Sequence, residues 1–98
     1  MHGEMRSMEK LKKEYEFFGA HKIKEMRFAF RVWAPDAVQI SVVGDFNDWD
    51  EHIDRMHQIS PGIWEAEVDG VKKYDCYKYA ITAKDGRVLY KADPYGFH

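Results

Sequence analysis

The feature that most constrains the fold is a short alternation of apolar and polar residues, repeated along the chain between turn signals. It occurs in RFAFRVW (27–33), VQISVVG (38–44), IWEAEVD (63–69) and YDCYKYAITA (74–83), and VLYK (88–91) follows as the return strand of a hairpin. A repeat of two is the side-chain repeat of a β-strand with one buried face. Pro35 and the pair Asp85-Gly86 mark turns between these runs, and Asp-Gly is a strong hairpin signal. Several short strands separated by turns predict a mainly β chain folded as an immunoglobulin-like antiparallel β-sandwich.

The two ends of the chain carry different signals. Apolar side chains three or four positions apart between residues 5 and 18 predict a short N-terminal helix that ends at Gly19. We therefore expect residues 1–22 to form this helix with its lead-in, and residues 23–98 to form the sandwich. At the other end, ADPYGFH (92–98) turns the chain and supplies no strand. The sandwich is then short of a closing strand, as we expect for a piece of a longer protein.

Size and charge narrow the possible partners. The 98 residues suffice for one small domain, and an aromatic share of 15% favours strands. The formal net charge is −2, so the positive surplus that nucleic-acid binding needs is absent. No apolar run is long enough for a signal peptide or a membrane helix, and we expect no membrane partner. The single cysteine, Cys76, cannot form an internal disulfide and fits a cytoplasmic protein.

We expect no catalytic residue, no metal site and no cofactor in this chain. The acidic loop that begins at Asp45 fails the spacing of a calcium loop, since its fifth position is Trp49 and its twelfth is Met56. His52 and His57 lack the further ligands of a zinc site. No glycine-rich phosphate loop and no nucleophile elbow occur. The residues alone therefore predict a binding or scaffolding module.

The loop GDFNDWD (44–50) places a large aromatic side chain among turn residues. Sugar rings have apolar C–H faces and a rim of hydroxyls, which suit an exposed indole face and neighbouring polar groups. Trp49 is therefore either a platform for a sugar or a plug over the core, and the residues alone favour neither. Trp33 and Trp64 lie within strand patterns, and we expect both to pack.

A series of short motifs along the chain resembles that of one known protein family. The motifs are FFGAH (17–21), FRVWAP (30–35), VVGDFNDWD (42–50), GIWE (62–65), YKYAI (77–81), DGR (85–87) and KADPYGF (91–97). In this order and spacing the chain resembles the N-terminal module of bacterial glycogen branching enzymes. That module is an early-set, immunoglobulin-like β-sandwich of carbohydrate-binding module family forty-eight, also called the isoamylase N-terminal domain. Gly96 stands where such enzymes usually carry alanine, a minor departure.

The resemblance implies an activity for the longer protein. Such an enzyme cuts an α-1,4-linked glucan and transfers the freed segment to a 6-hydroxyl. An aspartate nucleophile and a glutamate acid/base act on a (β/α)₈ barrel that follows the module. A barrel takes about 250 residues, and this chain contains none of it. The module is expected to dock on that barrel.

The resemblance also implies which residues touch glucan. In sugar-binding members the tryptophan of the loop motif stacks on a glucose ring, and it corresponds to Trp49. A lysine in the strand before the Asp-Gly hairpin corresponds to Lys78, and Asn47 is the third expected binding residue. A second stacking tryptophan follows the hairpin in the best binders, whereas this chain has Val88 and Leu89.

Glucan binding is therefore expected to be weak. Two alternatives to a branching-enzyme module stay open. One is a purely structural module of a related isoamylase- or pullulanase-type enzyme, and the other is a glycogen-sensing regulatory subunit.

Overall fold

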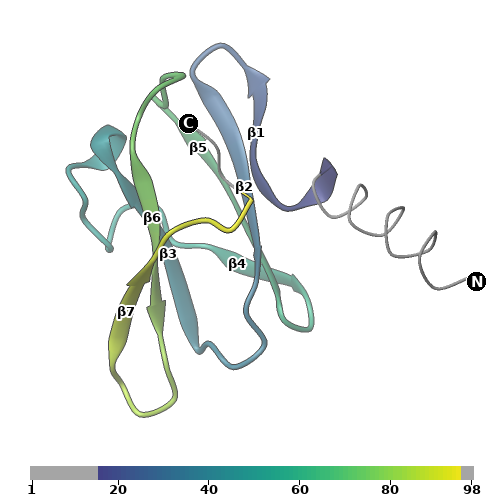
Figure 1. The fold of residues 1–98 in the computed structure, drawn as a ribbon, viewed down its shortest axis with the longest axis vertical. Coiled ribbons are helices and arrows are strands. Elements are labelled where there is room, and N and C mark those ends of the chain that lie inside the picture. The colour runs from purple at the N-terminus through teal and green to yellow at the C-terminus, as the bar shows by residue number, and fades with distance from the viewer. Residues whose placement is uncertain (1–15, 96–98) are drawn as a thin grey trace, which may run out of the picture.

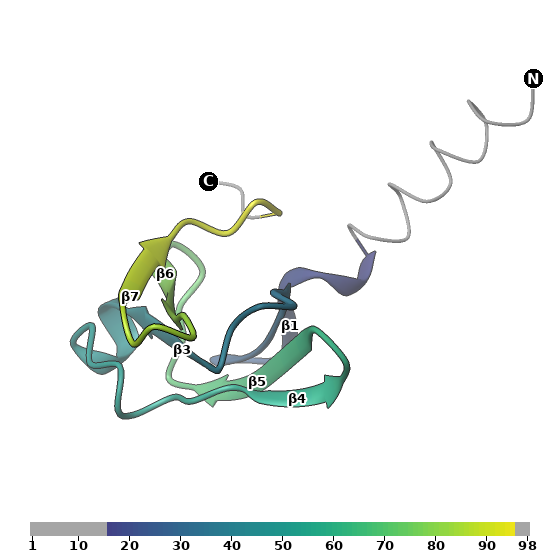
Figure 2. The same cartoon turned by 90° about the horizontal axis from the view of Figure 1, so that it is seen from below.

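The computed structural model describes residues 16–95, and Figure 1 shows their path. The strands are β1 (Gly19–Lys24), β2 (Arg27–Trp33), β3 (Gln39–Gly44), β4 (His57–Ser60), β5 (Ile63–Asp69), β6 (Tyr77–Thr82) and β7 (Val88–Lys91). A 3₁₀ turn, η1 (Asp45–Asn47), follows β3. One sheet has the order β1-β2-β5-β4 and the other has the order β3-β6-β7. All pairs are antiparallel, and Figure 2 shows the two sheets as separate layers. The predicted β-sandwich is confirmed.

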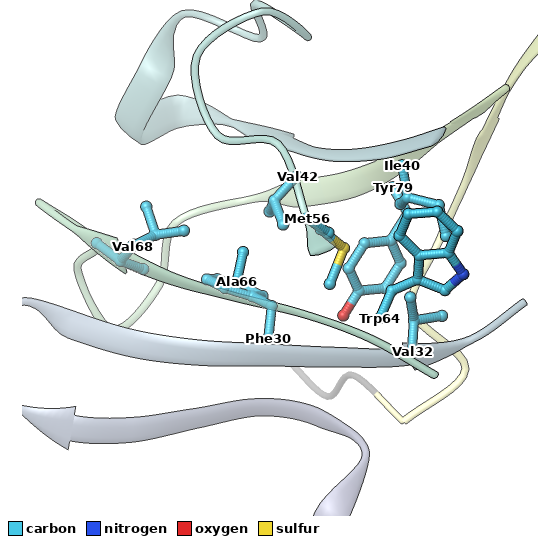
Figure 3. Close-up of a cluster of buried hydrophobic side chains, with 10 residues drawn as sticks. Phe30, Val32, Ile40, Val42, Met56, Trp64, Ala66, Val68 and Tyr79 are labelled. Atoms are coloured by element: carbon cyan, nitrogen blue, oxygen red, sulfur yellow. The ribbon is translucent and has the colours of Figure 1, made fainter. Parts of the chain in front are cut away.

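The core lies between the two sheets, where the inward residues of the alternating runs meet. Figure 3 shows the buried cluster, and Met56 reaches into it from the segment before β4. The cluster comprises Phe30, Val32, Ile40, Val42, Met56, Trp64, Ala66, Val68, Val71 and Tyr79. Trp64 packs as predicted, and its indole N–H donates a hydrogen bond to the Ala34 carbonyl at 3.1 Å. A buried indole N–H needs such a partner.

Two edge strands, β1 and β4, are absent from the sequence prediction. β1 has the sequence GAHKIK, and its pairing with β2 places Ala20 and Lys22 opposite the inward Phe30 and Phe28. All four residues of β4 are exposed. Edge strands bury little, so their sequences need not alternate. The helix predicted over 5–18 lies almost entirely outside the described residues and stays a prediction.

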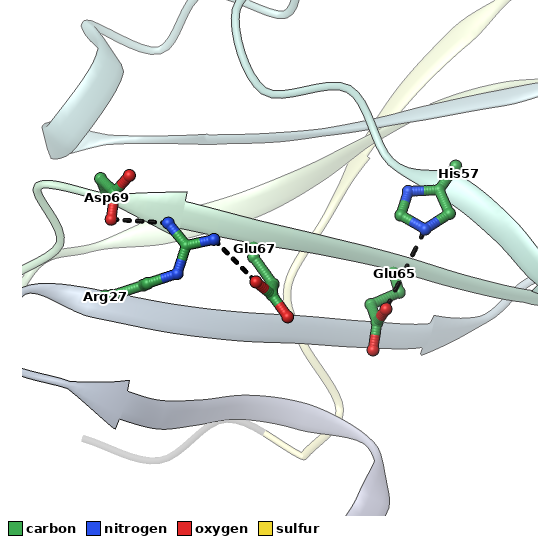
Figure 4. Close-up of polar contacts among 5 residues, drawn as sticks. All are labelled: Arg27, His57, Glu65, Glu67 and Asp69. Carbon is green, nitrogen blue, oxygen red and sulfur yellow. Dashed lines mark hydrogen bonds and ion pairs between the residues drawn. The ribbon is translucent and has the colours of Figure 1, made fainter.

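The outward face of the four-stranded sheet carries a ladder of charges. Arg27 donates to Glu67 and to Asp69, each at 2.7 Å. Further along the same face, His57 lies 4.0 Å from Glu65, as Figure 4 shows. Cross-strand pairs of opposite charge suit a solvated sheet face, and exposed ion pairs stabilise by only about 0–1 kcal/mol each. This face is a polar exterior.

Trp33 lies on this outward face, and the prediction that it packs is wrong. It pairs with Ile63 at the end of β2, and 62% of its surface is exposed. The alternation along β2 explains this, because Phe30 and Val32 point into the core. The adjacent residue in a strand must then point outward.

Candidate functional site at the end of strand β3

The loop after β3 separates its two aromatic side chains. Phe46 in η1 turns inward, and its ring stacks on Phe30 with centroids 5.9 Å apart. Asp48 and Trp49 then adopt left-handed backbone conformations, with φ of 56° and 60°. This reversal leaves Trp49 40% exposed. A left-handed conformation is uncommon for such a bulky residue and is often found at functional sites. Trp49 is therefore a partly exposed surface residue and no plug over the core.

Asn47 lies beneath the loop and holds its shape. Its side-chain oxygen accepts a hydrogen bond from the Gly44 N–H at 3.0 Å. Its amide nitrogen donates to the Val42 carbonyl at 2.9 Å and to the Asp54 carboxylate at 2.8 Å. The residue is buried, and both ends of its amide are engaged. We therefore revise the role predicted for Asn47 from contact with a sugar to support of the loop.

Asp45 connects Trp49 to the start of β6. One carboxylate oxygen accepts the Trp49 indole N–H at 3.2 Å, and the other accepts the Cys76 N–H at 2.8 Å. The Asp45 N–H donates to the Cys76 carbonyl at 3.0 Å, and the Trp49 N–H donates to the Gly44 carbonyl at 3.0 Å. The edge of the indole is thus fixed, and its N–H is already used. Sequence spacing does not reveal this role, because Cys76 lies 31 positions away.

Lys78 lies on the outward face of the three-stranded sheet, two residues beyond Cys76. It pairs with Val43 across β3 and β6 and is exposed. Its neighbour Tyr79 belongs to the core, so the Lys78 side chain points away from the core. Within the described residues it forms no ion pair. Trp49, in the loop that follows β3, and Lys78, near the start of β6, thus lie at paired strand ends and are both exposed.

This arrangement suits a neutral polar ligand with one apolar face. The indole face offers stacking, the lysine ammonium donates hydrogen bonds, and carboxylates of the loop accept them. Among residues 16–95 no group of three or more histidine, cysteine or acidic side chains is placed to hold a metal ion. Nor is any helix in that range long and apolar enough to cross a membrane.

A cavity of about 480 Å³ opens elsewhere in the molecule, between the two sheets. Its lining includes Phe28 and Tyr77 from the two sheets, and Asp93 and Tyr95 from the segment that follows β7. Its lining includes neither Trp49 nor Lys78. The cavity is therefore separate from the loop site.

Comparison with known proteins supports the assignment of the fold. Curated relatives named 1,4-alpha-glucan branching enzyme include one from Butyrivibrio fibrisolvens, 49% identical over 85 residues. Another, from Fusobacterium nucleatum subsp. nucleatum, is 45% identical over 86 residues. These alignments cover 83% and 86% of this chain but only 13% and 14% of the two enzymes. The chain thus spans about one seventh of the length of the curated relatives it matches.

Solved structures share the fold at lower identity. The catalytic module of the glycogen-degrading pneumococcal virulence factor SpuA aligns over 88% of this chain and 14% of that chain, with 24% identity and a TM-score of 0.63. A putative alpha amylase from Salmonella typhimurium aligns over 84% of this chain and 16% of that chain, with 20% identity and a TM-score of 0.58.

The family model described as carbohydrate-binding module 48 (isoamylase N-terminal domain) matches residues 17–96, which include both sheets and the whole loop site. The chain belongs to the carbohydrate-binding module 48 family.

Proposed function

We propose that this chain is the N-terminal module of a bacterial 1,4-α-glucan branching enzyme. The observation that carries the proposal is the 45–49% identity to enzymes of that name over nearly the whole chain. Such an enzyme moves an α-1,4-linked segment to a 6-hydroxyl, and the chemistry belongs to residues beyond this module. The module supplies no catalytic residue. Docking on the catalytic barrel is its second role.

The loop site gives the module a surface for α-glucan. The exposed face of Trp49 stacks on the apolar face of a glucose residue, while the Lys78 ammonium donates to its hydroxyls. One stacking contact adds about 0.5–1.5 kcal/mol beyond area burial, by analogy with aromatic pairs. A dissociation constant of about 1 mM already needs about 4 kcal/mol. The isolated module therefore binds glucan weakly, with a dissociation constant of about 1 mM or higher.

We propose that the protein is cytoplasmic and binds neither nucleic acid nor a membrane. Cys76 is an exposed free thiol, which is typical of a reducing compartment such as the cytoplasm. The net charge of −2 gives no surplus to attract nucleic acid or an anionic membrane surface.

A titration with maltoheptaose tests the glucan site. We expect backbone amide signals of residues 45–50 and of Lys78 to shift in the ¹⁵N NMR spectrum of the 98-residue chain. Trp49→Ala should abolish these shifts while changing the melting temperature by less than about 2 °C, because the indole is partly exposed and outside the core cluster.

The same variant tests the alternative of a purely structural module. A melting temperature lowered by several degrees, with glucan binding unchanged or never detected, favours the structural role. The proposal that the longer protein is a branching enzyme is tested separately, by assaying the full-length gene product for new α-1,6 linkages in amylose. A full-length protein without such activity refutes the assignment to branching enzymes.

A further inference from the structure

One row of residues on the outward face of the three-stranded sheet includes two that are almost fully buried. Ser41 on β3, Ala80 on β6 and Tyr90 on β7 lie opposite one another in register. Their neighbours Val42 and Tyr79 point into the core, so this row points outward. Yet Ser41 and Ala80 are each only 2% exposed. Something on the outward face therefore covers them.

Two hydrogen bonds to Glu51 identify the cover. The Ser41 hydroxyl donates to the Glu51 carbonyl at 2.6 Å, which places the loop after Trp49 above β3. The Tyr90 hydroxyl donates to the Glu51 carboxylate at 2.9 Å. To reach it from β7, the Tyr90 ring must extend across the sheet over Ala80. Alanine offers only a methyl group there, so the ring can lie low on the sheet, and half of Tyr90 stays exposed.

Tyr90 and Trp49 are held in the same way. A carboxylate of one loop fixes each ring, since Asp45 accepts from Trp49 and Glu51 accepts from Tyr90. Between them runs β6, where Lys78 points outward two residues before Ala80. Neighbouring strands lie about 4.8 Å apart, so β3 and β7 are separated by about 10 Å. Trp49, in the loop after β3, and Tyr90, on β7, are thus two fixed aromatic rings that flank β6, the strand that carries Lys78.

We propose that Tyr90 is a second glucan-contacting residue, which stacks on a glucose residue next to the one held by Trp49. The inference rests on the proposed function of the loop site. The bond to Glu51 leaves the ring face as the contact surface and removes the hydroxyl hydrogen from use by the sugar. An α-glucan chain lying across β3, β6 and β7 then meets Trp49, Lys78 and Tyr90 in turn. The aromatic ring of Tyr90 supplies a stacking surface on this face of β7, which the small aliphatic side chain of Val88 does not.

The test compares maltoheptaose affinities of variants of the 98-residue chain by NMR titration. Tyr90→Ala should raise the dissociation constant about 2- to 10-fold, the range expected for loss of one aromatic contact. Tyr90→Phe keeps the ring and should stay within about 2-fold of the original chain. Leu89→Ala is the matched control, because Leu89 is similarly exposed but pairs with Ile81, on the opposite face of β7. It should leave the affinity unchanged.

A second measurement needs no substitution. The ring-proton signals of Tyr90 in the original chain should shift on addition of maltoheptaose. If Trp49→Ala abolishes binding while Tyr90→Ala binds as before and the Tyr90 ring signals stay fixed, the inference about Tyr90 is wrong and the loop site stands. If the original chain shows no glucan-dependent shift anywhere, both proposals fail.

Discussion

At the scale of single residues, Asp45 is the junction of the loop site. Its carboxylate accepts from the Trp49 indole through one oxygen and from the Cys76 backbone through the other. The orientation of the indole therefore depends on a residue that need not touch the ligand. Hydrogen bonds to a charged acceptor are stronger than neutral ones, and this pair fixes the ring before any sugar arrives. Pre-ordering of a contact residue lowers the entropy lost on binding.

The first prediction concerns Asp45→Asn. The substitution turns one accepting oxygen into an NH₂ donor, which then faces an N–H of either Trp49 or Cys76. We expect maltoheptaose binding to weaken about 2- to 10-fold, since the net contribution of one hydrogen bond is about 0.5–1.5 kcal/mol. The Trp49 indole N–H signal should shift and exchange faster with water. Both are measured by NMR.

Asp48→Asn is the control for charge. It removes the same charge from the same loop, but the Asp48 side chain makes no hydrogen bond within the described residues, and asparagine tolerates its left-handed backbone. If the two variants weaken binding equally, the effect of Asp45 is electrostatic and the bonds are irrelevant.

Single residues also mark the limit of sequence-based prediction at the site. The motif predicted Trp49 and Lys78 as glucan contacts; both are exposed in the structure, and the contact itself stays a prediction. The motif could not predict that Asn47 is buried, because an asparagine in a turn is equally suited to solvent and to backbone contacts. Nor could it predict Asp45 and Tyr90, whose partners Cys76 and Glu51 lie far away in sequence.

At the scale of elements, the alternation of apolar and polar residues located the strands that contribute most side chains to the core. β2, β3, β5 and β6 coincide with alternating runs because their inward residues fill the core. β1 and β4 bury few side chains, so no hydrophobic pattern marked them, whereas the equally exposed β7 was located by the hairpin signal Asp85-Gly86. The start of β6 at Tyr77, three residues later than predicted, follows from the loop contacts of Cys76 with Asp45.

The second prediction concerns the junction between β3 and the loop. A side-chain carbon at Gly44 would lie 2.5 Å from the Cys76 carbonyl oxygen and 2.6 Å from the Phe46 ring. The backbone oxygen cannot move without breaking the pairing of the loop with β6. Gly44→Ala should therefore lower the free energy of unfolding by about 1–3 kcal/mol, measured by urea denaturation. It should also weaken glucan binding, because the clash displaces the loop.

Gly70→Ala provides the comparison. Gly70 has φ of 88° but no atom within 4 Å of the added carbon, so only backbone strain of about 1 kcal/mol applies. Glucan binding should be unchanged in this variant. If Gly44→Ala costs no more stability than Gly70→Ala and binds glucan normally, the close approach at Gly44 does not hold the loop.

At the scale of the whole molecule, Asp93 closes one end of the sandwich. After β7 the chain crosses to the other sheet, as Figure 1 shows, and the Asp93 carboxylate accepts from the hydroxyls of Tyr77 and Tyr79. Tyr95 then stacks on Phe18 beside β1, with ring centroids 5.5 Å apart. The sequence predicted a chain turn at this point. It gave no sign of the contact with β6, because the tyrosines are 14 and 16 positions away.

Because of this closure, the free energy of unfolding depends on pH in the alkaline range. Burial, together with Asp93, raises the pKa of Tyr77 and of Tyr79 above the ordinary value of 10. Each tyrosine thus keeps its proton in the folded chain at a pH where the unfolded chain has lost it. The stabilisation is complete below about pH 10 and is lost as pH rises towards the raised pKa values. Each tyrosine lowers the free energy of unfolding by at most about 1.4 kcal/mol for each pH unit above 10.

The third prediction is a fall in the free energy of unfolding between pH 10 and 11, measured by urea denaturation from pH 8 upward. Tyr79→Phe removes one titrating group, so its stability should start lower at pH 8 but fall less steeply above pH 10. Tyr74→Phe should fall as steeply as the original chain, because the Tyr74 side chain is 82% exposed and outside the closure. Parallel losses in the original chain and in Tyr79→Phe would show that alkaline unfolding begins elsewhere. A smaller slope in Tyr79→Phe alone would place the alkaline weak point of the module at the closure, on the side of β6 that faces away from Lys78 and Tyr90.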